Sequence, residues 1–154
     1  MGRPPFRLLL RVRYAECDAQ GVVFNARYGD YVDLAMTEFM RVLFGGYTEL
    51  LAQGLDNQVV RLATDWTAPA RFDDVLALDV EPLHLGNTSY RLKVSIFRHA
   101  DGVPVATSEI TYVMVTAGHH EKQPIPDHFR QRLQAAAPGV VVNLSGIDTP
   151  DVQP

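Results

Sequence analysis

The chain has 154 residues, 47% of which are hydrophobic, and its formal net charge is -4 at pH 7. This length and composition predict one globular domain with one sizeable core. Acidic and basic residues are interspersed, without the basic stripe that a nucleic-acid surface requires, and no segment is apolar for long enough to span a bilayer. We therefore expect no nucleic acid and no membrane among the partners.

The cysteine content bears on the cellular compartment. Cys17 is the only cysteine, which excludes an internal disulfide and any metal cage built from cysteines alone. Residues 1–10 include arginines and a run of three leucines, but they lack the longer apolar core and the small-residue cleavage site of a signal peptide. We expect a reducing compartment, with the cytoplasm as the default location.

The first part of the chain predicts a strand followed by a long helix. Residues 7–14 (RLLLRVRY) alternate apolar and mostly basic side chains, which is typical of a half-buried strand. From Tyr28 onward the apolar side chains recur at helical spacing and form one stripe. The members of this stripe are Tyr28, Tyr31, Val32, Ala35, Met36, Phe39, Met40 and Leu43. Gly45 and Gly46 then predict the end of the helix.

The second part predicts a sheet. Four runs rich in Val, Ile, Leu, Tyr and Thr predict strands at residues 58–67, 75–83, 89–98 and 103–116. Two connections between these runs, HLGNTS and HADG, are short enough for hairpins, whereas parallel strands need a long crossover. We therefore expect these four strands to form an antiparallel meander.

A short helix is predicted near the C-terminus. It covers residues 127–137, is introduced by Pro124 and Pro126, and is ended by the Pro-Gly pair that follows. A single domain, residues 1–138, thus accounts for all predicted elements. Residues 139–154 form a C-terminal tail, and the sequence leaves open whether it is ordered or disordered.

Together these elements predict an α+β fold in which one antiparallel sheet of about five strands wraps around the long helix. One helix covers only one face of a sheet. Apolar residues occupy both sides of one strand, since Leu76, Leu78 and Val80 alternate with Val75 and Ala77. We therefore expect a second subunit to cover part of the sheet, in a homodimer or a homotetramer.

The junction between the first strand and the helix, AECDAQGVVFNARYGDY (residues 15–31), contains more functional groups than a connecting turn requires. A helix start presents unpaired N–H groups and about half a positive charge, both of which stabilise negative charge. This field favours an ionised Asp18 that can act as a base or a nucleophile. The same N–H groups suit the oxyanion that develops on a substrate carbonyl. Gly21 permits a tight turn, after which residues 22–24 are expected to bury themselves and orient the next amides.

A structural interpretation of the same junction competes with the catalytic one. A loop Asp before a helix is usually a turn or capping residue, and Asn25 suits the N-cap of a helix that begins at Ala26. Such loop carboxylates are common and functional sites are few, so the pattern alone favours the structural interpretation.

A family resemblance changes this balance. Residues 11–41, RVRYAECDAQGVVFNARYGDYVDLAMTEFMR, resemble the opening of the 4-hydroxybenzoyl-CoA thioesterase-like branch of the hotdog-fold family, in which a D-x-x-G-x-V element precedes a tyrosine-containing helix start. APARFDD (68–74) resembles the entry to the third strand of that family, and LGNTSYRLKVSIF (85–97) resembles its hairpin into the fourth. The resemblance extends from about residue 8 to residue 137.

The resemblance implies a hotdog fold, dimers whose sheets run together, and hydrolysis of acyl-CoA thioesters at the dimer interface. Asp18 matches the catalytic Asp of the family, acting as nucleophile or as general base on water. Asn25 matches the position whose backbone amide donates to the oxyanion. The substrate-binding residues that the resemblance implies are Gly21, Val22, Phe24, Tyr28, Ser89 and Arg91.

The chain departs from the family pattern at two places. The position of Asn25 is often His or Tyr in this branch, so the role of that side chain differs here. Members can carry basic residues just before the serine that matches Ser89, where this chain has Asn87 and Thr88. A grip on the CoA phosphates then depends on basic residues elsewhere, namely Arg71, Arg91, Lys93 and Arg98.

Other chemistries have weaker support. Cys17 is a candidate nucleophile with a histidine as base, but no spacing selects a pair, and free cysteines mostly behave as small buried residues. Glu38 is the second candidate for the catalytic base, because another hotdog branch uses a glutamate on the helix, although a solvated or salt-bridged role is commoner. His119 and His120 are neighbours on an extended strand end, where side chains point to opposite sides, so they suit a metal poorly.

We therefore expect a cytoplasmic acyl-CoA thioesterase without metal or cofactor, since no nucleotide-binding or zinc-protease motif is present. One alternative is a protein that binds acyl-CoA or an acyl group without cleaving it. Another is a hotdog hydratase, which normally needs a histidine beside its acid, where this chain has Asn25. The sequence leaves open the acyl group, CoA against acyl-carrier protein, and a dimer against a tetramer.

Overall fold

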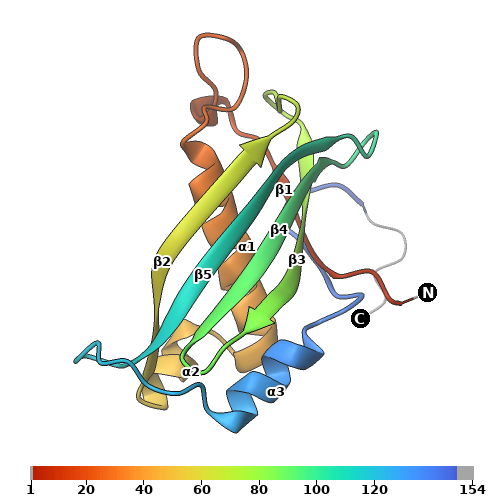
Figure 1. Cartoon of the computed structure of the whole chain (residues 1–154). Helices are drawn as coiled ribbons and strands as arrows, with labels where there is room; N and C mark the ends of the chain where they lie inside the picture. Colours follow the sequence, from red (N-terminus) through yellow and green to blue (C-terminus); the bar gives the residue numbers. More distant parts are fainter. Residues whose placement is uncertain (1, 149–154) are drawn as a thin grey trace.

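The computed structural model describes residues 2–148, which form one six-stranded sheet and three α-helices (Figure 1). The helical elements are η1 (Tyr14–Glu16, a 3-10 turn), α1 (Arg27–Phe44), α2 (Tyr47–Ala52) and α3 (Asp127–Ala135). The strands are β1 (Phe6–Arg11), β2 (Leu55–Trp66), β3 (Val75–Leu85), β4 (Ser89–Arg98), β5 (Pro104–Thr116) and β6 (Val141–Asn143). No helix within residues 2–148 is long and apolar enough to cross a membrane.

The strand order in the sheet is β2-β5-β4-β3-β1-β6. The two predicted hairpins are confirmed, since β3 pairs antiparallel with β4 and β4 with β5. The prediction of a four-strand meander was wrong for β2, which pairs with β5 at the sheet edge, while β1 takes the place beside β3. The physical reason is the connection over residues 67–74, which is too long for a tight hairpin and carries the chain across the end of the sheet.

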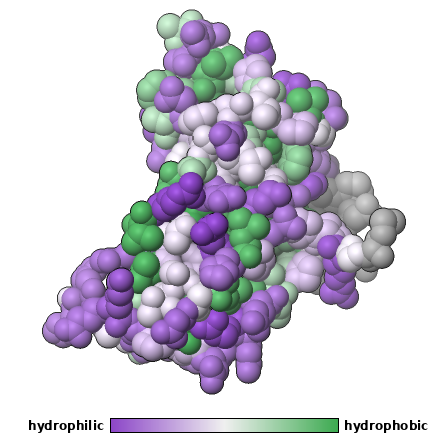
Figure 2. Space-filling model, viewed as in Figure 1, coloured by the Kyte–Doolittle hydropathy of each residue, from purple (hydrophilic) through white to green (hydrophobic). Residues whose placement is uncertain are grey.

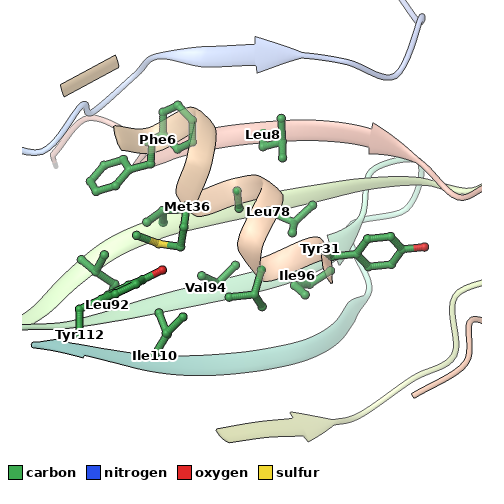
Figure 3. Packing of buried hydrophobic residues seen from close by; sticks show 14 of the residues in the cluster. Phe6, Leu8, Tyr31, Met36, Leu78, Leu92, Val94, Ile96, Ile110 and Tyr112 are labelled. Atoms are coloured by element: carbon green, nitrogen blue, oxygen red, sulfur yellow. The ribbon is translucent and has the colours of Figure 1, made fainter. Parts of the chain in front are cut away.

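The apolar stripe of α1 packs across one face of this sheet. Tyr31, Ala35 and Phe39 are fully buried and share one cluster with strand residues that include Leu78 and Ile96 (Figure 3). The predicted helix over residues 28–43 is confirmed. Gly45 ends it in the left-handed conformation (φ 85°), which costs glycine little. Each fully buried large apolar side chain in this layer contributes about 1.5–3 kcal/mol to folding.

The opposite face of the sheet carries mostly polar side chains at its exposed positions, and the apolar Leu9 and Ala77 on that face are already buried within one chain. Leu76, Leu78 and Val80 point into the core beneath α1 and are buried within one chain. On the other face, the Arg7 guanidinium pairs with the Asp79 carboxylate at 2.6 Å. Figure 2 shows that the side chains visible on this face are mostly hydrophilic.

Exposed apolar side chains instead occur along the edge strand β2, where hydrophobic patches are visible in Figure 2. Those of β2 are Val59, Val60, Leu62 and Trp66. The strand is 12 residues long, and no strand within residues 2–148 pairs with its outer side. An unprotected edge of this length is a typical template for pairing with another chain.

Three local predictions differ from the structure. β1 ends at Arg11, so Tyr14 lies in η1 with its side chain exposed. The polar stretch after α1 contains a short helix, α2, that the pattern did not indicate. The predicted tail contributes β6, which pairs parallel with β1, so the sheet has six strands and is mixed. Residues 149–154 of that tail lie outside the described residues.

The packing of α1 on the sheet predicts the effect of a core truncation. Leu78→Ala removes a side chain with 0% exposure from the centre of the cluster. We expect the free energy of unfolding, measured by urea titration, to fall by about 2–5 kcal/mol. Leu83→Ala, on the same strand but exposed, is the matched control, with an expected change of about 0.5 kcal/mol or less. Equal losses in both variants would contradict this description of the core.

Candidate active site

Residues 16–24, here called the Asp18 loop, form a miniature antiparallel ladder before α1. The Asp18 N–H donates to the carbonyl of Val22 at 2.9 Å, and the Phe24 N–H donates to the carbonyl of Glu16 at 2.9 Å. Cys17 forms an antiparallel bridge with Val23 between them. The loop is therefore held by its own backbone, and its two sides lie next to one another.

Gly21 closes the turn of this loop. Its N–H donates to the carbonyl of Asp18 at 3.0 Å, and its φ of 75° lies in the left-handed region. The sequence analysis assigned Gly21 this function on the basis of residue type, and the conformation agrees. Residues 22–24 behave differently from the expectation that all three are buried, because Val23 is buried, Val22 is half-buried and Phe24 is exposed. The ladder explains this pattern, since successive side chains of an extended segment point to opposite sides.

The Asp18 carboxylate is half-buried and forms no ion pair within residues 2–148. Its Oδ1 accepts a hydrogen bond from the Gln20 N–H at 2.8 Å, which fixes the direction of the side chain. No hydrogen bond to Oδ2 from the described residues is present. The carboxylate is thus oriented by the loop and keeps one oxygen available.

The start of α1 lies directly after this loop. Arg27 is the first helical residue, and Ala26 occupies the N-cap position without a side-chain cap. The expectation of an Asn25 N-cap is therefore wrong by one residue. The Arg27 N–H donates to the Phe24 carbonyl at 2.9 Å, and the Tyr28 N–H to the Asn25 carbonyl at 3.3 Å. The amides of Asn25 and Ala26 donate no hydrogen bond within residues 2–148, so they remain free for an external acceptor.

An aromatic wall stands at the helix start. Tyr28 is buried, and its ring meets the ring of Trp66 edge-on at 5.9 Å and that of Tyr31 at 5.7 Å. Burial raises the pKa of the Tyr28 hydroxyl, which keeps it protonated near neutral pH. The Asp18 loop also contacts the connection over residues 67–74, because the Val23 N–H donates to the carbonyl of Ala70 at 2.8 Å.

The structure does not bring Ser89 and Arg91 to this place within one chain. Both lie at the start of β4, at the end of the sheet where α2 and α3 are located, whereas the Asp18 loop and the start of α1 lie at the other end (Figure 1). Arg91 is exposed there and lies 3.9 Å from the carboxylate of Glu109. Of the predicted site residues, the structure therefore groups those of the loop and helix start only.

A cavity of about 410 Å³ opens further along α1, and Asp18 does not line it. It lies between α1, α2 and the strands β2 and β5. Its apolar wall consists of Met36, Met40, Phe44, Leu50 and Val59, with Tyr112 at its side. Asn57 also lines it, and the buried Oδ1 of this residue has no hydrogen-bond partner in the described structure.

The competing candidates have ordinary surroundings. The Glu38 carboxylate pairs with the Arg41 guanidinium one helical turn later, in agreement with the salt-bridged interpretation. The Cys17 thiol lies 3.9 Å from the carbonyl of Arg13 and makes no hydrogen bond to a histidine in the described residues. Within residues 2–148 no group of three His, Cys, Asp or Glu side chains is arranged to hold a metal ion.

One residue of this region was missed by the sequence analysis. Glu16 is 5% exposed, and its carboxylate accepts a hydrogen bond from the Tyr31 hydroxyl at 3.0 Å. The two residues are fifteen positions apart on different elements, so no helical or strand spacing pairs them. The sequence signal for Glu16 was an acidic residue two positions before Asp18.

The loop and helix start coincide with the region that a known family shares. The chain belongs to the thioesterase-like superfamily, whose family model matches residues 12–133. Its α+β fold is accordingly the hotdog fold, and the chain is by class a thioester hydrolase.

Individual relatives agree with this assignment. An acyl-CoA thioesterase, YbgC, from Haemophilus influenzae is 32% identical over 109 residues, which are 70% of this chain and 80% of that protein. The acyl-CoA thioester hydrolase YbgC from Escherichia coli O6:H1 is 34% identical over 84 residues, 54% of this chain and 63% of that protein, so the match spans less than two thirds of the relative. A crystal structure of a thioesterase superfamily protein from Jannaschia sp. CCS1 has the same fold, with a TM-score of 0.80, 24% identity, and coverage of 90% of this chain and 98% of that chain.

The left-handed conformation of Gly21 predicts that a residue with a Cβ at this position lowers the stability of the protein. No atom lies within 4 Å of a Cβ built at Gly21, so Gly21→Ala creates no clash and changes only the backbone preference. We expect the free energy of unfolding to fall by about 1–2 kcal/mol, because a left-handed φ disfavours residues with a Cβ. Gly29→Ala, at a helical position with ordinary contacts, is the control. Its free energy of unfolding is expected to rise by about 0.5–1 kcal/mol. A neutral Gly21→Ala would argue against the described turn.

Proposed function

We propose that this protein hydrolyses acyl-CoA thioesters to the free acid and CoA, with Asp18 as the reacting carboxylate and the Asn25 amide as oxyanion donor. The observation that carries the proposal is one juxtaposition. The Asp18 carboxylate lies on one side of the loop ladder, and the other side leads directly into the amides of Asn25 and Ala26. Within residues 2–148 the carboxylate forms no ion pair and these two amides donate no hydrogen bond. The YbgC relatives, an acyl-CoA thioesterase and an acyl-CoA thioester hydrolase, supply the substrate class.

In this mechanism the thioester carbonyl oxygen accepts a hydrogen bond from the Asn25 N–H at the positive end of α1. Asp18 either attacks the carbonyl carbon or removes a proton from a water that attacks it. The negative charge moves to the carbonyl oxygen, and the C–S bond then breaks with departure of the CoA thiolate. If Asp18 is the nucleophile, this leaves an acyl anhydride on Asp18, which a water hydrolyses to release the free acid and restore the carboxylate. A thiolate is a good leaving group, so no strong general acid is required. Removal of one oxyanion donor typically costs about a hundred- to a thousandfold in rate.

Gly21, Val22, Phe24 and Tyr28 are the proposed contacts for the acyl end of the substrate. They occupy the loop and the helix start, and the half-buried Val22 and exposed Phe24 offer apolar surface beside the carboxylate. Tyr28 adds the aromatic wall with Trp66. These contacts place the reacting carbon near the charged groups and exclude water from its far side.

Asp18→Asn provides the direct test. The substitution keeps the side-chain volume and removes the negative charge, so CoA-thiol release from a panel of acyl-CoAs, followed with a thiol-reactive dye, is expected to fall at least a thousandfold. Asp30→Asn is the matched control, because Asp30 is an exposed acid in the first turn of α1 and makes the same change in net charge. Full activity in Asp18→Asn would refute the mechanism.

The same assay separates the open alternatives. Retention of intact acyl-CoA by the wild-type protein, without turnover, would show a binding protein instead of an enzyme. A single turnover in heavy-oxygen water tests the nucleophilic role of Asp18, because label in the Asp18 carboxylate requires a covalent anhydride that water opens at the Asp18 carbon. A general base leaves Asp18 unlabelled and places the label in the product acid.

We further propose that the working unit is a homodimer or homotetramer joined through β2. The exposed apolar residues of this edge strand support an assembly through β2. The distance of Ser89 and Arg91 from the Asp18 loop supports it too, because only a second copy can bring Ser89 and Arg91 to the site. Arg91 of a neighbouring copy would then meet the CoA phosphates.

Val60→Glu tests the assembly. Val60 is 58% exposed on β2 at the position of a β-bulge, and a charge there is expected to convert the oligomer to a monomer in sedimentation experiments, with at least a tenfold loss of activity. Leu144→Glu, similarly exposed near the opposite edge of the sheet, is the control expected to change neither property. A fully active monomer would contradict the proposal.

A further inference from the structure

Glu16 is a buried acid for which the proposed chemistry has no use. Its Oε1 accepts hydrogen bonds from the Arg13 N–H at 2.7 Å and from the Tyr31 hydroxyl at 3.0 Å. Its Oε2 accepts one from the Arg13 guanidinium at 3.1 Å. Burying a carboxylate is costly unless its oxygens are hydrogen-bonded, so these donors determine where Glu16 can lie.

Tyr31 holds this acid from the helix side. It lies one turn into α1, with 1% exposure, and Figure 3 shows its ring directed away from the middle of the apolar cluster, with the hydroxyl at the far end. Burial, together with the hydrogen bond and negative charge of Glu16, raises the pKa of the Tyr31 hydroxyl well above its ordinary value. The hydroxyl is therefore a donor throughout the neutral range. Its bond to Glu16 joins the Asp18 loop to a rigid element.

Glu16 is also connected to both sides of the proposed site. It precedes Asp18 by two residues along the first side of the ladder. Its carbonyl accepts the Phe24 N–H at 2.9 Å, which positions the residue immediately before Asn25. A shift of Glu16 relative to α1 would move the Asp18 carboxylate and change the orientation of the Asn25 amide together.

We infer that Glu16 and Tyr31 are positioning residues for thioester hydrolysis, and that their hydrogen bond sets the distance between the Asp18 carboxylate and the amides at the start of α1. This inference rests on the proposed function. The ladder fixes the two sides of the loop against each other, and the contact with Ala70 fixes the loop to a neighbouring connection. The Glu16–Tyr31 bond adds a side-chain link from the loop to α1 itself. A displacement of about 1 Å at a reacting centre can cost about a hundredfold in rate.

Tyr31→Phe tests this link because it removes the hydroxyl and keeps the packed ring. We expect kcat for acyl-CoA hydrolysis to fall about tenfold or more, with KM within about twofold of the wild-type value and an unchanged circular dichroism spectrum. Tyr90→Phe is the matched control. Tyr90 is equally buried, but its hydroxyl has no partner in the described residues, and it lies at the other end of the sheet, so its kcat is expected to stay unchanged.

Two substitutions of Glu16 test the acceptor side. Glu16→Gln keeps an oxygen that can accept from Tyr31, whereas Glu16→Met has similar length and no such oxygen. We expect Glu16→Gln to retain kcat within about threefold and Glu16→Met to lose at least as much as Tyr31→Phe. Adding Tyr31→Phe to Glu16→Met should then cost less than about twofold more, because the bond is already absent.

The outcomes distinguish this inference from the proposed function. A wild-type kcat in Tyr31→Phe, or losses that simply multiply in the double variant, would overturn the positioning role, even with an inactive Asp18→Asn. Full activity in Asp18→Asn would overturn the proposed function itself. If Glu16→Met does not fold, Tyr31→Phe alone decides, since it leaves the buried acid and the aromatic packing in place.

Discussion

The burial of one helical stripe against one face of a sheet is the constraint on which the other features of this protein depend. Tyr31, Ala35 and Phe39 reach the core only when this face of α1 meets the sheet, and the connection from β1 through the Asp18 loop sets the direction of the helix. That direction puts the first turn of α1 beside the last residue of β2, Trp66, and beside the end of β1 (Figure 1). The hydrophobic effect, together with this connection, thus decides where the positive end of the helix dipole lies, although it has no preference for charge.

Two carboxylates two residues apart show how surroundings assign different roles to the same chemical group. Glu16 is buried and all of its oxygens accept hydrogen bonds, so it holds other groups in place. Asp18 is half-buried, is oriented by one backbone N–H and forms no ion pair among the described residues. Glu16, whose oxygens all accept hydrogen bonds, stabilises the structure, whereas Asp18, with one oxygen available, suits a reaction with a substrate. Membership of the thioesterase-like superfamily agrees with this division, because a thioester carbonyl needs both a reactive oxygen and an oxyanion donor.

The single chain does not bring all the proposed site residues together. In the proposed mechanism the loop and helix start supply the charged groups for the carbonyl, but Ser89 and Arg91 lie at the far end of the sheet. The outer face of the sheet is polar and carries pairs such as Arg7 with Asp79, so it offers little apolar area to a partner. The exposed valines of β2 do offer such area. These exposed side chains are the reason that we propose assembly through the strand edge and not through the sheet face.

Local periodicity in the sequence determined the types of most elements. The helical stripe from Tyr28, the strands that became β3, β4 and β5, and the two hairpins depend on side-chain spacing and turn residues, which act over a few positions. The Asp18 loop was also visible, because Gly21 and the helix start are local features. The place of β2 beside β5, the pairing of β6 with β1, and the Glu16–Tyr31 bond were decided only in three dimensions. Each of these joins residues from separate elements, and such pairings depend on which surfaces remain unpaired once the core has formed, a quantity that no short window of sequence contains.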